Sequence, residues 1–156
     1  MTAIPQFRMF HKDDLPELEK MILALYQEDP PGEEISSQKI LLTVQELLSH
    51  PEKGGITMFC GNNTVVGYAI VIYYWSNEYG GNIALIDEFY IKSAWRGKGI
   101  GINFLEHLAT DNTGNLKGLL VEVTPSNERA FIYYSRNGFS PTTNRHLFKK
   151  MQRNQA

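Results

Sequence analysis

The sequence contains a single cysteine, Cys60, so no disulfide can form within one chain. It has no apolar run of the roughly 18 residues that a membrane helix needs, and no basic-then-apolar leader at its start. Its 15 Lys and Arg residues against 17 Asp and Glu residues lack the basic excess of nucleic-acid-binding proteins. These absences predict a soluble cytoplasmic protein without a nucleic-acid or membrane partner, and they favour a buried, inert Cys60.

The four histidines also lack the spacing of a metal-ligand set, so we expect no metal. Apolar content, in contrast, is ample, because 42% of the 156 residues are hydrophobic. A chain of that length and composition can bury a core without disulfides. It has no repeat, linker or low-complexity tract. We therefore expect one domain over residues 1–156, ending in a flexible tail at about 151–156.

The hydrophobic pattern predicts two helices before a region rich in strands. Asp14 and Glu17 form a capping-box pattern at the start of a helix that continues to about Tyr26. A second helix is predicted from the capping pair Ser36-Ser37 to near His50-Pro51. Strands are predicted at 6–10, 56–60, 64–75, 83–91, 119–123 and 145–151, with further helices near 102–109 and 126–139. This order predicts an α+β domain.

A glycine-rich loop, Trp95–Gly101 (WRGKGIG), joins the strand at 83–91 to the following helix. The first amides of a helix lack intrahelical acceptors and carry partial positive charge, and glycines let an anion approach them closely. The loop has no hydroxyl residue after its Gly-Lys pair and no G-x-G-x-x-G spacing, so it matches neither the ATP and GTP loops nor the dinucleotide loops. It is therefore either a tight turn or an anion site of another type.

Two motifs extend this observation. Arg96, Gly99 and Gly101 fit the pattern Arg/Gln-x-x-Gly-x-Gly/Ala. A later segment fits N-x-x-A-x-x-x-Y-x-x-x-G-F, with Asn127, Ala130, Tyr134, Gly138 and Phe139 at the matching positions. Together they resemble the GNAT superfamily of N-acetyltransferases, and the strand and loop also look like those of diamine and polyamine acetyltransferases.

The resemblance implies a GNAT-like three-layer fold, a mixed and mostly antiparallel sheet with a splay and helices on both faces. It implies acetyl-CoA as the cosubstrate, and often a homodimer. The residues implied in cofactor binding are the main chain of Phe89, Tyr90 and Ile91 for pantetheine, the loop residues Arg96, Gly97, Lys98, Gly99, Ile100 and Gly101 for pyrophosphate, and Asn127. The side chains of Arg96 and Lys98 either contact phosphate or stay solvated, and Asn127 either contacts the cofactor or only caps its helix.

Two carboxylates, Asp87 and Glu88, interrupt an otherwise apolar strand. Side chains alternate along a strand, so we expect Asp87 to share a face with Phe89, and Glu88 to share the other face with Ile86 and Tyr90. A carboxylate on an apolar face costs free energy unless it is solvated, paired or used. The resemblance places the general base, usually Glu, at Asp87, where the shorter side chain favours transfer through water. Glu88 is the alternative base, and either carboxylate can instead be structural.

The resemblance also makes Tyr134 the acid that protonates the leaving thiolate, whereas its neighbour Tyr133 is expected in the core. The segment at 28–34 (EDPPGEE) groups four carboxylates near the acceptor pocket, which favours a small cationic amine such as a polyamine, an aminoglycoside or an amino acid-like molecule. The same segment can also be a solvated connector. The alternatives for the whole chain are a silent acyl-CoA-binding module, a protein or peptide N-acetyltransferase, and an unrelated nucleotide-binding domain.

Overall fold

The computed structural model describes residues 4–110 and 115–152. Its elements are, in chain order, β1 (Gln6–Met9), α1 (Leu15–Glu28), α2 (Ser37–Ser49), β2 (Gly54–Gly61), β3 (Thr64–Ser76), β4 (Gly81–Ile91), α3 (Ile100–Thr110), β5 (Leu116–Val121) and α4 (Glu128–Arg136). Short 3-10 turns precede α1, β2 and α3, at Lys12–Asp14, Pro51–Lys53 and Ser93–Trp95. That residues 1–156 form one domain stays a prediction, and most of the expected flexible tail lies outside the described residues.

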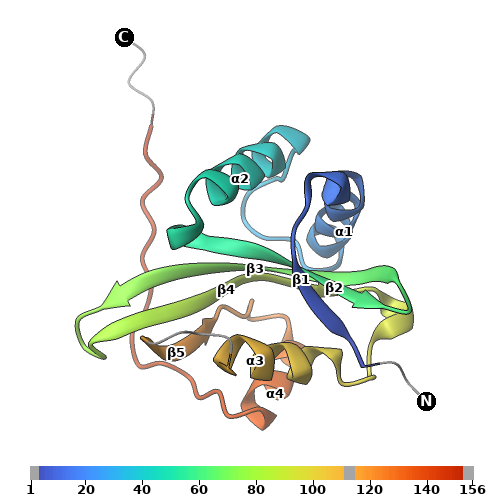
Figure 1. The fold of residues 1–156 in the computed structure, drawn as a ribbon. Helices are drawn as coiled ribbons and strands as arrows, with labels where there is room; N and C mark the ends of the chain where they lie inside the picture. Colours follow the sequence, from blue (N-terminus) through green and yellow to red (C-terminus); the bar gives the residue numbers. More distant parts are fainter. Residues whose placement is uncertain (1–3, 111–114, 153–156) are drawn as a thin grey trace.

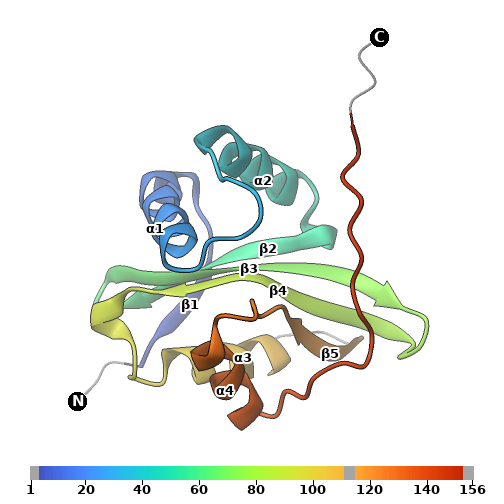
Figure 2. The ribbon, with the colours of Figure 1, turned by 180° about the vertical axis from the view of Figure 1, so that it is seen from behind.

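The strands form one sheet in the order β1-β2-β3-β4-β5. Neighbours among β1 to β4 are antiparallel, whereas β5 runs parallel to β4. Helices α1 and α2 cover one face of the sheet, and α3 and α4 lie on the other (Figure 1 and Figure 2). The predicted α+β arrangement, a mixed and mostly antiparallel sheet between helices, is therefore confirmed.

The sheet opens between β4 and β5. Strand β5 pairs with β4 only as far as Val121 opposite Ile86, whereas β4 stays paired with β3 as far as Ile91 opposite Gly67. From Asp87 onward, the edge of β4 that faces away from β3 has no strand partner among the described residues. This opening is the predicted splay, and it exposes main-chain groups of β4 to a ligand.

Two hydrophobic cores hold the layers together. Leu18 and Tyr68 are fully buried between the sheet and the helices α1 and α2. On the other face Phe59 and Phe104 are fully buried, with their ring centroids 4.8 Å apart. Burying one such large apolar side chain contributes about 1.5–3 kcal/mol relative to leaving it exposed. Strands β4 and β5, which border the opening, are thus held in place by packed side chains.

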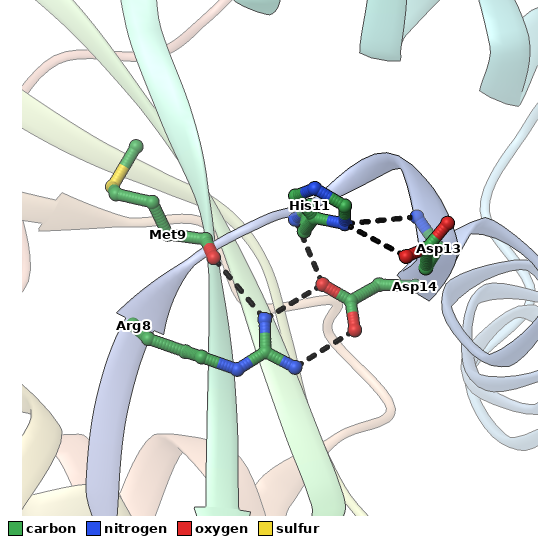
Figure 3. Close-up of polar contacts among 5 residues, drawn as sticks. All are labelled: Arg8, Met9, His11, Asp13 and Asp14. Carbon is green, nitrogen blue, oxygen red and sulfur yellow. Dashed lines mark hydrogen bonds and ion pairs between the residues drawn. The ribbon is translucent and has the colours of Figure 1, made fainter.

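The start of α1 differs from the prediction. Asp14 does precede the helix, but its carboxylate makes no capping bond to it. It accepts two hydrogen bonds from the guanidinium of Arg8, at 2.7 and 2.8 Å, and one from the amide of His11 at 2.8 Å (Figure 3). The bond from Arg8 is the main reason why the pKa of Asp14 is lowered. The predicted capping box is wrong, because Asp14 ties β1 to the beginning of the helix instead.

The predicted strand at 145–151 is also wrong. Residues 140–152 contain no helix or strand. Leu147, Phe148 and Met151 are 97%, 89% and 82% exposed. The segment rises past the sheet and ends away from the body of the protein (Figure 2). A strand needs a neighbouring backbone to satisfy its amides and carbonyls, and this segment pairs with no strand among residues 4–110 and 115–152.

Candidate active site

A groove of about 880 Å³ opens at the splay. Its walls are the end of α1, the second half of β4, the glycine loop, the segment after β5, and α4. All the predicted site residues except Lys98 line it, namely Asp87, Glu88, Phe89, Tyr90, Ile91, Arg96, Gly97, Gly99, Ile100, Gly101, Asn127 and Tyr134. The ammonium of Lys98 instead lies over the ring of Trp95, 4.7 Å from its centroid.

The glycine loop forms an open cradle at the N-terminus of α3. Gly97 and Gly99 have φ angles of 74° and 78°, which favour glycine. A Cβ added at Gly97 would meet nothing within 4 Å, so a ligand can approach the backbone there. The first amides of α3, from Ile100 onward, lack intrahelical acceptors and carry partial positive charge. This cradle fits the pyrophosphate that the resemblance implies.

Arg96, next to this cradle, is held by the protein itself. Its Nε donates to the carbonyl oxygen of Ile91 at 2.7 Å, and its Nη2 lies 2.9 and 2.8 Å from the two carboxylate oxygens of Glu28. The guanidinium also lies over the ring of Tyr90, 5.4 Å from the centroid. The side chain therefore ties α1 to the glycine loop, and a phosphate contact by Arg96 stays a prediction.

The end of α1 contacts both walls of the groove. Glu28 reaches the glycine loop, and the next residue, Asp29, accepts hydrogen bonds from the Thr124 hydroxyl at 2.8 Å and the Asn127 amide at 3.2 Å. Asn127 also caps α4, since its Oδ1 accepts from the amide of Ala130 at 3.1 Å. The capping role of Asn127 is confirmed, whereas its cofactor contact stays a prediction. Sequence reasoning missed Asp29 and Thr124 as partners, because no local pattern links residues 95 positions apart.

A β-bulge in β4 decides where the two carboxylates lie. Ile86 and Glu88 pair with adjacent residues of β3, so Asp87 between them is an extra residue without a partner there. A bulge shifts the alternation of side chains. Ile86 and Phe89 therefore both pack on the α3 side, whereas Glu88 meets Tyr26 of α1. The predicted grouping of Glu88 with Ile86 is wrong for this reason, whereas the grouping of Asp87 with Phe89 stays a prediction.

Glu88 is a carboxylate held by two phenols. Its Oε2 accepts from the hydroxyl of Tyr26 and its Oε1 from the hydroxyl of Tyr68, both at 2.8 Å. Burial raises the pKa of Glu88, and the two phenol bonds act in the opposite direction. Burial also raises the pKa of each tyrosine, so both keep the protons that they donate. Glu88 is thus a fixed acceptor whose two oxygens are already engaged.

Asp87 is the more available carboxylate. The residue is exposed to the groove, and its side chain has no hydrogen-bond partner within residues 4–110 and 115–152. The walls of the groove still remove part of the hydration of its carboxyl, which raises its pKa, and the negative charge of Glu122 adds to this shift. A carboxylate with a raised pKa that faces a cleft is suited to accept a proton. Glu122 was not among the predicted site residues, because nothing in its local sequence distinguishes it.

Helix α4 places two tyrosines in the groove. Burial, together with the neighbouring Tyr133, raises the pKa of Tyr134, so its hydroxyl stays protonated at neutral pH. Tyr133, expected in the core, is half-buried: its hydroxyl is buried, but the residue also lines the groove, with its ring centroid 5.3 Å from that of Tyr134. Gly138, with φ of 88°, ends the helix, and Phe139 folds back to within 5.2 Å of the Tyr134 ring.

The sequence profile of the acetyltransferase (GNAT) family matches residues 19–139. The chain belongs to the GNAT acetyltransferase family. The GNAT fold binds acetyl-CoA, in agreement with the cradle and the splay. A comparison with curated protein sequences gave no match.

Solved structures share this GNAT fold over nearly the whole chain. A possible acetyltransferase from Clostridium difficile 630 is 24% identical, with a TM-score of 0.80, and the match covers 96% of this chain and 100% of that one. A ribosomal-protein-alanine N-acetyltransferase from Brucella melitensis biovar Abortus 2308 is 14% identical, with a TM-score of 0.73 and coverage of 94% and 100%. AAC(6')-Iy, in complex with the bisubstrate analog CoA-S-monomethyl-acetylneamine, is 14% identical, with a TM-score of 0.72 and coverage of 96% and 99%. At these identities the likeness establishes the fold.

Two of the four carboxylates in the acidic segment 28–34 of this GNAT chain form ion pairs. Besides the pair between Glu28 and Arg96, Glu33 lies 2.7 Å from the ammonium of Lys150 and 3.9 Å from that of Lys39. The segment therefore carries less free negative charge than its composition indicates. The carboxylates that line the groove are better placed to meet a cation than Glu33 is.

Two further findings concern residues 4–110 and 115–152. None of their helices combines the length and the apolar character of a membrane span. No group of three or more His, Cys, Asp or Glu residues among them is arranged to hold a metal ion. The cytoplasmic location and the independence from metal stay predictions.

Proposed function

We propose that this GNAT protein is an acetyl-CoA-dependent N-acetyltransferase that transfers acetyl directly to a primary amine of a small cationic molecule. The observation that supports it most is the meeting of three features in one groove: the glycine cradle of α3, the unpaired edge of β4, and the pair Asp87 and Tyr134. A silent acyl-CoA-binding module needs only the first two features. The additional carboxylate and phenol favour a catalyst.

The described residues fit the cosubstrate. Acetyl-CoA, when bound, supplies the acetyl group as a thioester. The amides of Gly97 to Gly101 would hold its pyrophosphate. Main-chain groups of Phe89 and the amide of Ile91, which face the open edge of β4, would pair with pantetheine as an added strand does. Tyr90 lies opposite Tyr68, and its carbonyl oxygen points toward β3, so it is not available for this pairing. Ile91 has less capacity for this role, because its carbonyl oxygen already accepts from Arg96.

Asp87 and Tyr134 would divide the proton transfers. An alkylamine has a pKa of roughly 10.4 and arrives protonated, so it must lose a proton before its nitrogen can attack. Asp87 would accept this proton through a water molecule, and its raised pKa makes it a better acceptor than an ordinary Asp. Tyr134 would donate its hydroxyl proton to the departing sulfur as the new C–N bond forms and the C–S bond breaks, and the second proton that the attacking nitrogen releases would restore the Tyr134 phenol. Its raised pKa keeps that proton in place until negative charge develops.

The charge of the groove favours a cationic acceptor. Its lining carboxylates are Glu28, Asp29, Asp87, Glu88 and Glu122, against the two arginines Arg96 and Arg129. Negative walls raise the local concentration of cations, an effect that salt screens. The similar solved structures include both a ribosomal-protein-alanine acetyltransferase and an enzyme in complex with an acetylneamine bisubstrate analog. We therefore base the choice between a protein and a small-molecule acceptor on the charge of this groove. We propose a polyamine, an aminoglycoside or an amino acid-like amine as the acceptor, in line with the resemblance to polyamine acetyltransferases.

The test is the release of coenzyme A thiol from acetyl-CoA with matched panels of polyamines, aminoglycosides, amino acids and peptides. We expect turnover with at least one small polycationic amine, and a KM that rises with salt. Turnover with peptides alone would contradict the small-molecule acceptor. Tight binding of acetyl-CoA without any accepted amine would instead support the silent module.

The homodimer is a proposal that the C-terminal segment supports. Residues 140–152 are extended and leave large apolar side chains exposed, and β5 is the last strand of the described sheet, with one open edge. Open strand edges attract further strands. The ion pair between Lys150 and Glu33 joins two exposed side chains, so it holds the segment to its own chain only weakly. Two copies can thus place their segments on each other's β5 in a symmetric exchange.

A further inference from the structure

The hydroxyl of Tyr133 is buried and has no hydrogen-bond partner within residues 4–110 and 115–152. The great majority of buried polar side-chain atoms in folded proteins are hydrogen-bonded, because an unsatisfied one costs free energy. Tyr133 lies on α4 next to Tyr134, with the two ring centroids 5.3 Å apart, and its main-chain carbonyl oxygen accepts a hydrogen bond from the side chain of Asn137 at 2.8 Å. Because Tyr133 lines the ligand groove, a ligand group is a candidate partner for this unsatisfied hydroxyl.

The position of this hydroxyl shows which part of the groove it serves. A Cβ added at Gly101 would lie 2.4 Å from the Tyr133 oxygen and 3.2 Å from Cζ of Phe89. The oxygen therefore lies against the backbone of the first turn of α3. Glycine at position 101 leaves the space that the hydroxyl occupies. The last glycine of the loop thus has a packing role in addition to admitting an anion.

The electrostatics at this point favour an acceptor with negative charge. The first turn of α3 presents free amides and the positive end of the helix dipole. Burial raises the pKa of Tyr133, so its hydroxyl remains a donor at neutral pH. A phenol donor beside free amides matches the oxygens of a phosphate group, and hydrogen bonds to charged acceptors are the stronger ones.

We propose that Tyr133 is a cofactor-binding residue whose hydroxyl donates a hydrogen bond to a pyrophosphate oxygen of coenzyme A at the N-terminus of α3. The inference rests on the proposed function, because it requires that cosubstrate in the groove. It gives the adjacent tyrosines separate tasks. Tyr133 contacts the phosphate end of the ligand, and Tyr134 serves the sulfur.

The first test is the affinity of Tyr133→Phe for free coenzyme A, measured by isothermal titration calorimetry. We expect Kd to rise about tenfold, the size of effect that loss of one hydrogen bond to a charged group produces. The unliganded variant should melt at the same temperature as the wild type or higher, because an unsatisfied buried hydroxyl has been removed. A residue with a purely structural role gives the opposite pair of results, a lower melting temperature and an unchanged Kd, which would overturn the proposal.

Two matched arms locate the contact. Tyr74→Phe removes an exposed hydroxyl outside the groove and should leave the Kd for coenzyme A within about twofold of the wild type. Adenosine diphosphate keeps a pyrophosphate but lacks pantetheine, so its binding, measured by competition with coenzyme A, should weaken in Tyr133→Phe by a similar factor. Loss of coenzyme A affinity without loss of adenosine diphosphate affinity would place the contact on pantetheine and overturn the assignment. A wild-type protein that does not bind coenzyme A would instead overturn the proposed function itself.

A second variant tests the close approach. Gly101→Ala places a methyl group against the Tyr133 hydroxyl, so it should lower the free energy of unfolding in the wild-type background. The same substitution should cost less in the Tyr133→Phe background, where the colliding oxygen is absent, and the two changes should be non-additive. Strict additivity in chemical denaturation would contradict the geometry on which the proposal stands.

Discussion

The hydroxyl of Tyr26 lies 2.8 Å from Oε2 of Glu88, which fastens α1 to β4 at the residue beside the candidate base. Tyr68 holds the other carboxylate oxygen at the same distance. The two phenols come from different elements, one from α1 and one from β3. Glu88 thereby links α1, through Tyr26, and β3, through Tyr68, to the bulge of β4 that contains Asp87.

The first prediction is that the hydrogen bond between Tyr68 and Glu88 contributes to the free energy of unfolding. Tyr68→Phe removes one donor from Glu88 in a fully buried position, so it should lower the free energy of unfolding by about 1–3 kcal/mol. Tyr74→Phe is the matched control, because Tyr74 lies on the same strand and is exposed, and it should change stability by less than about 0.5 kcal/mol. Equal effects of the two substitutions in urea denaturation would show that the bond to Glu88 contributes nothing.

A second prediction concerns pH. If Asp87 is the base, kcat/KM rises as pH rises through the pKa of Asp87, since only the ionised carboxylate accepts a proton. This pKa is raised, so the rise should occur above the ordinary Asp value of about 3.9. Asp87→Asn should lower kcat/KM by roughly 10²-fold and remove this limb of the profile. Glu88→Gln should have the smaller effect on the rate.

The charge of Glu122 gives an independent test of the direction in which the pKa of Asp87 is shifted. A like charge disfavours ionisation, so Glu122→Gln should lower the pKa of Asp87 and move the acidic limb of the profile toward lower pH. A limb that does not move in Glu122→Gln, or one that survives in Asp87→Asn, would assign the titration to another group. A larger rate loss in Glu88→Gln than in Asp87→Asn would make Glu88 the base.

The third prediction separates chemistry from binding at α4. Tyr134→Phe keeps the ring and its contact with Phe139 but removes the hydroxyl, so kcat should fall by roughly 10²-fold while the protein stays folded. Steady-state kinetics together with the melting temperature measure both quantities. Normal turnover in a folded Tyr134→Phe protein would leave Tyr134 with a packing role alone.

The helices and the glycine loop could be predicted because each depends on local sequence, whereas the layers and the splay are implied by the resemblance to the GNAT family. Helical periodicity marks α1 and α2, and the spacing of Arg96, Gly99 and Gly101 marks the cradle between β4 and α3. The bulge at Asp87 could not be predicted, because apolar residues on both sides of it satisfy the two-residue period of a regular strand. Bulge geometry depends on how β3 and β4 pair, which no single strand encodes.

Contacts between distant segments were also beyond prediction from one sequence. The unsatisfied hydroxyl of Tyr133 is an example, since its position depends on how α4 packs against Gly101 of α3. The segment at 145–151, where the sequence predicts a strand, is a second example. Its composition indicates that it can pair as a strand, but the partner is a property of the tertiary or quaternary structure.

The last prediction concerns that partner. If the C-terminal segment pairs with β5 of a second copy, the protein should have the mass of a dimer in light scattering after gel filtration. Leu147→Asp combined with Phe148→Asp places two charges on the nearly fully exposed apolar side chains and should shift the mass to that of a monomer. Lys149→Asp changes the charge at the next position and spares the apolar contacts, so it should leave most of the dimer intact. A wild-type monomer contradicts the exchange, because the segment would then fold onto its own chain or stay unpaired. A dimer that survives both aspartates also contradicts it, since the interface must then lie elsewhere.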